Sequence, residues 1–209
     1  MHYSLKKIGE IKIVPVVKIE NSKHALSLGS ALLDGGLPLA EITFRTDAAE
    51  ESIRILTKSM SELLVGAGTV LKVDQVKRAV DAGAAFIVTP GFNPKVVDYC
   101  VEHAIPITPG INSPSQIEMA LDRDITVVKF FPAEASGGLQ MLKALSAPYT
   151  EVRFMPTGGI NMGNLKQYLA FPKVFACGGS WMVKADFISG ENFSEITRLA
   201  KEAVDLVKS

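Results

Sequence analysis

The sequence predicts an α/β fold, a closed (β/α)8 barrel of the TIM type with a short extra helix at its N-terminus. Three observations lead to this prediction: apolar β-rich runs alternate with helical patterns, eight such units fill 209 residues, and Gly and Pro cluster just after the strands. Strict alternation favours a parallel sheet. Eight units at this length favour a closed barrel, with an open doubly wound sheet as the alternative. Because no linker or charge block divides the chain, residues 1–209 are predicted to form a single domain.

Each predicted unit is a short apolar run followed by a segment in which apolar residues recur at helical spacing. Consecutive rather than alternating apolar residues are typical of parallel strands buried on both faces. The residues before Lys12 predict the extra helix, placed at the bottom of the barrel. The predicted strands are 13–17, 39–44, 63–68, 86–89, 105–108, 126–131, 152–155 and 174–177. The predicted helical segments are 23–34, 48–58, 73–82, 94–103, 115–121, 139–145, 162–169 and 193–207.

Composition and charge argue against several classes of partner. Lys+Arg and Asp+Glu number 22 each, so no net basic field attracts nucleic acid or anionic lipid. His2, His24 and His103 lie on the tail and on helices rather than at strand ends, so no metal site is expected. No Walker-type phosphate loop is present, which argues against a nucleoside triphosphate. Cys100 and Cys177 make no disulfide framework. With no signal-peptide core or membrane-length apolar stretch, the sequence predicts a soluble cytoplasmic protein.

A lysine interrupts the apolar run 127–132, at Lys129. That run predicts a strand buried on both faces, where a charge is rare. Burial favours the neutral form of an amine, which is a nucleophile able to form a Schiff base with a carbonyl. The alternative is a lysine near the strand end that extends its amine into water. Lys18, at the end of the first strand, is a rival amine, whereas Arg153 at the start of the seventh is interpreted as structural.

Strand parity places a carboxylate in the same interior. Glu41, Thr43 and Arg45 share one face of the second strand, because alternate residues of a strand face the same side. If that face points inward, Glu41 lies in the lumen and Arg45 at the rim, while Lys129 lies near the mouth with Phe131 above it. A buried acid and amine that share an interior are typical of a functional site, with a structural ion pair as the alternative. Arg45 is suited to binding a carboxylate, or is a solvated loop residue.

Glycine-rich segments follow the strands and indicate a ligand site. In a barrel these loops lie on the C-terminal face, where active sites are found, and glycine lets the backbone approach a ligand. Ordinary turn chemistry is the alternative. The last two segments predict a phosphate site, and Asn161 is predicted to be the N-cap of a helix beside it. The segments are Gly66-Ala67-Gly68-Thr69, Thr89-Pro90-Gly91, Thr108-Pro109-Gly110, Pro156-Thr157-Gly158-Gly159 and Gly178-Gly179-Ser180.

Six motifs, taken in chain order, identify a family. They are Val14-Pro15-Val16, Glu41-Ile42-Thr43-Phe44-Arg45-Thr46, Gly66-Ala67-Gly68-Thr69-Val70, Lys129-Phe130-Phe131-Pro132-Ala133-Glu134, Pro156-Thr157-Gly158-Gly159-Ile160 and Gly178-Gly179-Ser180-Trp181. In this order they resemble the 2-keto-3-deoxy-6-phosphogluconate (KDPG) aldolases, which are often also 4-hydroxy-2-oxoglutarate (KHG) aldolases. The resemblance spans nearly the whole chain, and the fourth and fifth motifs are highly specific.

The resemblance implies a class I aldolase that is a homotrimeric (β/α)8 barrel and needs no metal or other cofactor. It implies that Lys129 forms the Schiff base with pyruvate and that Glu41 is the general acid/base. It also implies that Arg45 and Thr69 contact the pyruvate carboxylate or neighbouring groups. The other substrate-binding residues implied by the match are Pro90, Phe131 and Thr157, with Gly158, Gly159, Gly179 and Ser180 at the phosphate.

The implied reaction is the reversible cleavage of KDPG to pyruvate and glyceraldehyde 3-phosphate, a lyase step of Entner-Doudoroff carbohydrate metabolism. Cleavage of KHG to pyruvate and glyoxylate is implied as a second activity. Alternatives through the same imine are a galactonate-specific (KDPGal) aldolase and an oxaloacetate decarboxylase. Alternatives of other classes are a sugar-phosphate isomerase that uses Glu41 as base, and a non-catalytic protein that binds a phosphorylated ligand.

Overall fold

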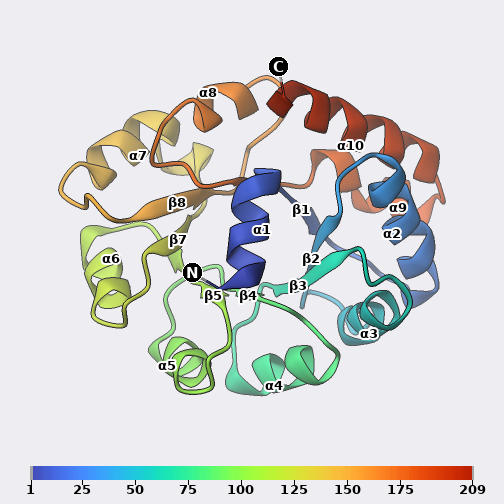
Figure 1. Cartoon of the computed structure of the whole chain (residues 1–209), viewed down its shortest axis with the longest axis horizontal. Coiled ribbons are helices and arrows are strands. Elements are labelled where there is room, and N and C mark those ends of the chain that lie inside the picture. The colour runs from blue at the N-terminus through green and yellow to red at the C-terminus, as the bar shows by residue number, and fades with distance from the viewer. Residues whose placement is uncertain (1, 209) are drawn as a thin grey trace.

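The computed structural model describes residues 2–208, which form a ring of parallel strands enclosed by helices (Figure 1). The first and last residues of the predicted domain 1–209 lie outside the described range. The strands are β1 Ile13–Val17, β2 Leu39–Thr43, β3 Leu64–Gly68, β4 Ile87–Val88, β5 Ile107–Thr108, β6 Gly110–Ile111, β7 Val127–Phe130, β8 Arg153–Pro156 and β9 Cys177–Gly179. The helices are α1 Tyr3–Ile11, α2 Ala25–Asp34, α3 Ala49–Ser59, α4 Val73–Asp81, α5 Pro94–Glu102, α6 Pro114–Leu121, α7 Gly138–Ser146, α8 Leu165–Leu169, α9 Ala185–Ser189 and α10 Phe193–Lys208, with short 3-10 helices η1 Ser22–His24, η2 Glu134–Ser136 and η3 Trp181–Val183.

The strands close into a barrel through two runs of neighbours. One run has the order β5-β4-β3-β2-β1-β9 and the other the order β6-β7-β8. The two runs meet on one side because β5 and β6 are halves of one strand, interrupted at Pro109, which has no N–H to donate to a neighbouring strand. On the other side, parallel bridges join Phe154 to Val174 and Thr157 to Gly178. The closed ring confirms the predicted (β/α)8 barrel over the open sheet.

Helix α1 closes the bottom of the barrel and confirms the predicted extra helix. It lies across the centre of the ring in Figure 1, and its Ile8 is buried among lumen side chains such as Val14, Leu39 and Met155. A larger apolar cluster fills the space between the strands and the outer helices. Burial on both faces explains why the strands carry continuous apolar runs. The lower lumen is therefore apolar and filled.

Two predicted boundaries are wrong, for local physical reasons. The last strand runs over Cys177–Gly179 rather than 174–177, so Gly178 and Gly179 belong to the strand and not to the loop after it. A Cβ at Gly178 would lie 2.4 Å from Thr157 Oγ1, so only glycine permits this close pairing. The helix predicted over 162–169 begins at Leu165.

Asn161 is not the N-cap of that helix, because its side chain stabilises a turn instead. Its Oδ1 accepts a hydrogen bond from the backbone N–H of Gly163, and its own N–H donates to Asn164 Oδ1. Asparagine turns of this kind compete with helix starts. The structure also adds α9 and three 3-10 helices that the periodicity did not predict. The remaining predicted helix and strand ends differ by no more than a few residues from those observed.

Candidate active site

The centre of the candidate site is a buried ion pair between two strands on opposite sides of the lumen. Lys129 Nζ of β7 lies 3.7 Å from Glu41 Oε1 of β2, and the two side chains are 5% and 0% exposed. The inward orientation predicted from strand parity is confirmed, and the Lys129 amine does not extend into water. The rival amine, on Lys18, pairs with Glu20 at 2.6 Å and is 42% exposed. Of the two candidate amines, Lys129 is therefore the buried one.

The Glu41 carboxylate lacks hydrogen-bond donors. Within residues 2–208 neither of its oxygens has a hydrogen-bond partner, although both are buried. The 3.7 Å separation from Lys129 Nζ is an ion-pair distance but exceeds that of a hydrogen bond. Buried polar atoms are nearly always satisfied, and exceptions concentrate at functional sites. The geometry favours a site that a ligand completes over a purely structural pair.

Two glycines of β3 leave space for neighbouring side chains, Gly68 for Glu41 and Gly66 for Phe86. A Cβ at Gly68 would lie 2.0 Å from Glu41 Oε1, and a Cβ at Gly66 would lie 2.2 Å from the Phe86 ring. The prediction was that these glycines let the backbone approach a ligand. The structure shows another use, because their missing side chains make room for Glu41 and Phe86. Thr69 follows directly with a positive φ of 54°, which turns the chain sharply at the end of β3.

Arg45 lies at the rim and is oriented by Thr43. The Arg45 Nε donates to Thr43 Oγ1 at 3.0 Å, and that hydroxyl donates to the Val17 carbonyl at 2.6 Å. The guanidinium itself is exposed. An anchored guanidinium that opens to the mouth of the barrel is suited to a carboxylate.

Phe131 and the Pro90 loop lie on the Lys129 side of the mouth. Lys129 Nζ is 5.1 Å from the centroid of the Phe131 ring. Lys129 pairs in register with Gly110, where a Cβ would meet the Pro90 carbonyl carbon at 2.3 Å. Thr89, which was not among the predicted site residues, fixes this loop: its hydroxyl donates to the Gly91 carbonyl at 2.7 Å and accepts from the Gly110 N–H at 3.2 Å.

The glycine segments at the ends of β8 and β9 adjoin each other. Gly158 and Gly159 have positive φ angles of 97° and 84°, and Thr157 bridges to the segment of Gly178. A Cβ at Gly158 would lie 3.3 Å from the Phe131 ring, which brings this loop next to the surroundings of Lys129.

Beside these segments, Gly179 packs against the indole of Trp181, whose Nε1 is buried without a hydrogen-bond partner in the described structure. Ser180 is exposed at the start of η3. The predicted helix N-terminus does not form part of this arrangement, because α8 begins several residues later.

A second carboxylate, that of Glu134, packs against the Gly158–Gly159 loop. The Tyr168 hydroxyl donates a short hydrogen bond to Glu134, and the Glu134 side chain occupies the space where a Cβ of Gly159 would lie. Burial, with a further effect of this hydrogen bond, raises the pKa of Tyr168 above its ordinary value. Nothing in the sequence near Tyr168 predicted this long-range contact.

The remaining reactive side chains do not join the site. Burial raises the pKa of both the Cys100 and the Cys177 thiols to about 12, which keeps them protonated and unreactive. Among residues 2–208, no three His, Cys, Asp or Glu side chains are grouped so that they would hold a metal ion. In the same range, no helix combines the length and the apolar character that crossing a membrane requires.

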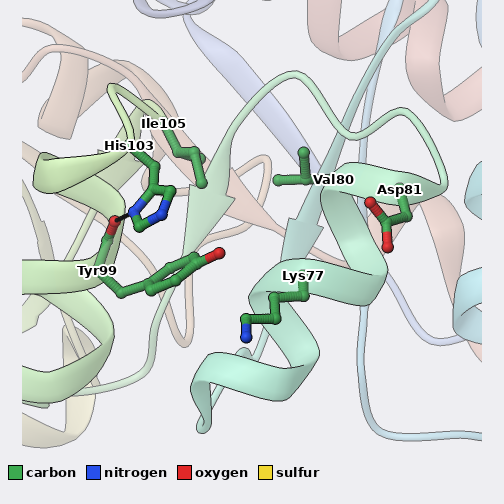
Figure 2. Close-up of a pocket in the computed structure, with 6 residues that line it drawn as sticks. All are labelled: Lys77, Val80, Asp81, Tyr99, His103 and Ile105. Carbon is green, nitrogen blue, oxygen red and sulfur yellow. Dashed lines mark hydrogen bonds between the residues drawn. The ribbon is translucent and has the colours of Figure 1, made fainter.

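A pocket on the outer wall is separate from this site. It lies between α4 and α5, where the Tyr99 and His103 rings stack with centroids 4.0 Å apart and Lys77 Nζ lies 5.6 Å from the Tyr99 centroid (Figure 2). None of the predicted site residues lines it. It contains no buried acid–amine pair like that of the lumen.

Comparisons with known proteins agree on one family. The family model described as "KDPG and KHG aldolase" matches residues 5–199. A 2-dehydro-3-deoxy-phosphogluconate aldolase from Haemophilus influenzae is 50% identical, over 98% of this chain and 96% of that protein. The KHG/KDPG aldolase of Escherichia coli K12 is 41% identical, over 94% of this chain and 92% of that protein. Among solved structures, a KDPG aldolase from Legionella pneumophila with pyruvate captured as a covalent carbinolamine intermediate has a TM-score of 0.93 and 37% identity, over 97% of this chain and 98% of that chain.

Proposed function

Because this chain belongs to the KDPG and KHG aldolase family, we propose that it reversibly cleaves KDPG to pyruvate and glyceraldehyde 3-phosphate through a Schiff base on Lys129. One observation carries the assignment of the site: the Lys129 amine and the Glu41 carboxylate are buried 3.7 Å apart. Neither carboxylate oxygen has a hydrogen-bond donor among residues 2–208. A nucleophile and a proton-transfer group must converge on one substrate, and this pair does so.

The first half of the proposed reaction forms the imine. Glu41 takes a proton from the Lys129 ammonium, the neutral amine attacks the C2 ketone, and Glu41 returns that proton to the former carbonyl oxygen to give a carbinolamine. Loss of that oxygen as water leaves a protonated imine. The positive nitrogen then accepts the electrons of the bond to be broken, so the step requires no metal or other cofactor.

The second half transfers protons through Glu41. The carboxylate takes the proton of the C4 hydroxyl, directly or through a water, and the C4 oxygen becomes the aldehyde carbonyl. The electrons of the C3–C4 bond move into the imine to give an enamine. Glu41 then returns a proton to C3, and water hydrolyses the imine to pyruvate and the free amine.

The surrounding residues are proposed to hold the two ends of the substrate. Arg45 binds the carboxylate with its free guanidinium edge, and Thr69 contacts the same region. Pro90 and Phe131 line the pyruvate part beside Lys129. The backbone of Gly158, Gly159 and Gly179, with Thr157 and the Ser180 hydroxyl, receives the phosphate, since N–H groups of glycine loops bind anions.

We propose KHG as a second substrate, since it presents the same 2-keto acid end and the same C4 hydroxyl, while a carboxylate replaces the phosphorylated end of KDPG. The printed name of the E. coli relative, KHG/KDPG aldolase, supports this. We also propose a cytoplasmic location, supported by the unpaired Cys100 and Cys177, which are typical of a reducing compartment. A homotrimer is proposed from the family resemblance, and light scattering should give three times the 22.5 kDa chain mass.

Borohydride reduction with pyruvate, followed by peptide mapping, tests the function and the site together. We expect a stable adduct on Lys129 in the wild-type protein and none in Lys129→Ala. No adduct, under conditions that trap a known class I aldolase, would overturn the proposal in favour of the isomerase or the binding protein. An adduct on Lys18 would retain the reaction class and overturn the site.

A further inference from the structure

We propose that Thr43 is a positioning residue that holds the Arg45 guanidinium for the substrate carboxylate. The inference rests on the proposed function, in which Arg45 binds that carboxylate. It extends the site by a residue that does not itself touch substrate.

The Thr43 hydroxyl links the end of β1 to the Arg45 side chain. Thr43 is the last residue of β2 and is 0% exposed. Its Oγ1 donates to the Val17 carbonyl, at 2.6 Å, where β1 ends. A hydroxyl has one proton, so this bond directs the oxygen lone pairs toward the Arg45 Nε–H at 3.0 Å. The Val17 carbonyl thereby fixes the direction from which the Thr43 hydroxyl can accept a hydrogen bond.

This contact leaves the useful edge of the guanidinium open. The two terminal nitrogens of Arg45 form no hydrogen bond or ion pair with the residues that the structure describes, while Nε is occupied by Thr43. A planar guanidinium anchored at Nε presents its two terminal N–H groups to a carboxylate in bidentate geometry. Because the arm is held before binding, less side-chain entropy is lost when the substrate arrives.

Placement along β2 relates this arm to the reacting centre. Glu41 and Thr43 share one face of β2, and Arg45 lies in the turn that follows, so the acid lies deepest and the arginine lies at the rim. The substrate carboxylate is bonded to C2, the atom that Lys129 attacks. A displaced guanidinium would therefore weaken the binding of the 2-keto acid end of the substrate, next to the atom that reacts.

Thr46 supplies a matched control for a purely structural role. Its hydroxyl donates to the Ile19 carbonyl at 2.6 Å, which is the same kind of anchor between the β2 and β1 segments. In residues 2–208 this hydroxyl accepts no hydrogen bond from a guanidinium. If hydroxyl-to-carbonyl anchoring alone mattered, loss of either hydroxyl would have the same consequence.

The test compares Thr43→Val, Thr43→Ser and Thr46→Val in the full-length enzyme. Thr43→Val keeps the shape and removes the hydroxyl, so we expect KM for KDPG and the half-saturating pyruvate concentration in borohydride trapping to rise about tenfold. The kcat should change by less than about threefold. Thr43→Ser should restore both values, and Thr46→Val should match wild type.

Coupling to Arg45 separates positioning from folding effects. Arg45→Lys should raise KM by itself, and Thr43→Val should add little in that background, because the group it orients is already changed. Additive effects, or an unchanged KM in Thr43→Val, would overturn the inference while wild-type trapping of pyruvate leaves the proposed function intact. Thr43→Ala adds no atom that can clash and is expected to give the same KM rise if Thr43→Val does not fold.

Discussion

Gly68→Ala tests whether the position of the Glu41 carboxylate controls turnover. Gly68 ends β3, and a Cβ there would lie 2.0 Å from Glu41 Oε1 and 2.7 Å from its Cδ. Ordinary van der Waals contact begins near 3.4 Å. The carboxylate must therefore move by roughly 1 Å or more before the added methyl group fits into the packed interior.

The expected effect is on chemistry rather than on binding. A displacement of about 1 Å at a reacting group costs about 100-fold in rate, which is ~2.7 kcal/mol in the activation barrier. We expect kcat for KDPG to fall by about that factor, while KM changes by less than about threefold because Arg45 and the phosphate loop are untouched. Since the Glu41 oxygens have no hydrogen bond to lose within the part of the chain that the structure describes, the free energy of unfolding should fall only by the ~1–3 kcal/mol that overpacking costs.

Pyruvate release, coupled to NADH oxidation, measures kcat and KM, and thermal unfolding is recorded on the same preparations. Gly91→Ala is the control, since a Cβ at that glycine would meet nothing within 4 Å and should leave kcat at the wild-type value. A folded Gly68→Ala enzyme with wild-type kcat would refute the reasoning. An equal loss in Gly91→Ala would show that the effect is not specific to Glu41.

Three further outcomes are expected. Glu41→Gln should still be trapped with pyruvate but lose most turnover, since the amide cannot exchange the proton; near-normal kcat would remove Glu41 from the mechanism. Ser180→Ala should raise KM for KDPG more than for unphosphorylated KHG, and equal increases would argue against the phosphate site. The raised pKa of Tyr168 means that the folded state retains a proton that the unfolded chain releases near pH 10, so stability should decline as pH rises above that value. Tyr168→Phe should lack this part of the decline in urea unfolding, and identical pH profiles for the two proteins would contradict the assignment.

The central pair could be predicted from sequence because each member is a single charge inside an apolar strand. The side chain of a strand residue in a barrel points either into the lumen or toward the outer helices. Because alternate residues share a face, the sequence shows which neighbours of Glu41 and of Lys129 point the same way. The distance of 3.7 Å between them confirms that both point inward. The regular alternation of strands and helices along the chain, rather than the strand propensity of single residues, predicted that both strands belong to one barrel.

The supporting contacts could not be predicted. Each depends on how segments that are far apart in the sequence pack against each other. Thr43 to Arg45 is short in sequence, but its direction depends on the Val17 carbonyl of another strand. Tyr168 reaches Glu134 only after α8 packs beside η2. Glycine has low strand propensity, which is why Gly178 was placed in a loop, and tertiary pairing against Thr157 overrides that preference.

The difference between the two ends of the lumen, apolar at the bottom and open at the mouth, explains why the buried Glu41 carboxylate has no donor among the described residues. Below the pair, the lumen is filled by apolar side chains such as Ile8, Val14 and Phe86, which offer no N–H or O–H group. The missing donors of Glu41 must therefore enter from the C-terminal mouth, where the substrate hydroxyl groups would lie. A protein donor at that position would satisfy the carboxylate and compete with the C4 hydroxyl, whose proton we propose that Glu41 accepts. The unpaired oxygens thus lower stability and keep Glu41 available for the proton transfer that we propose for it.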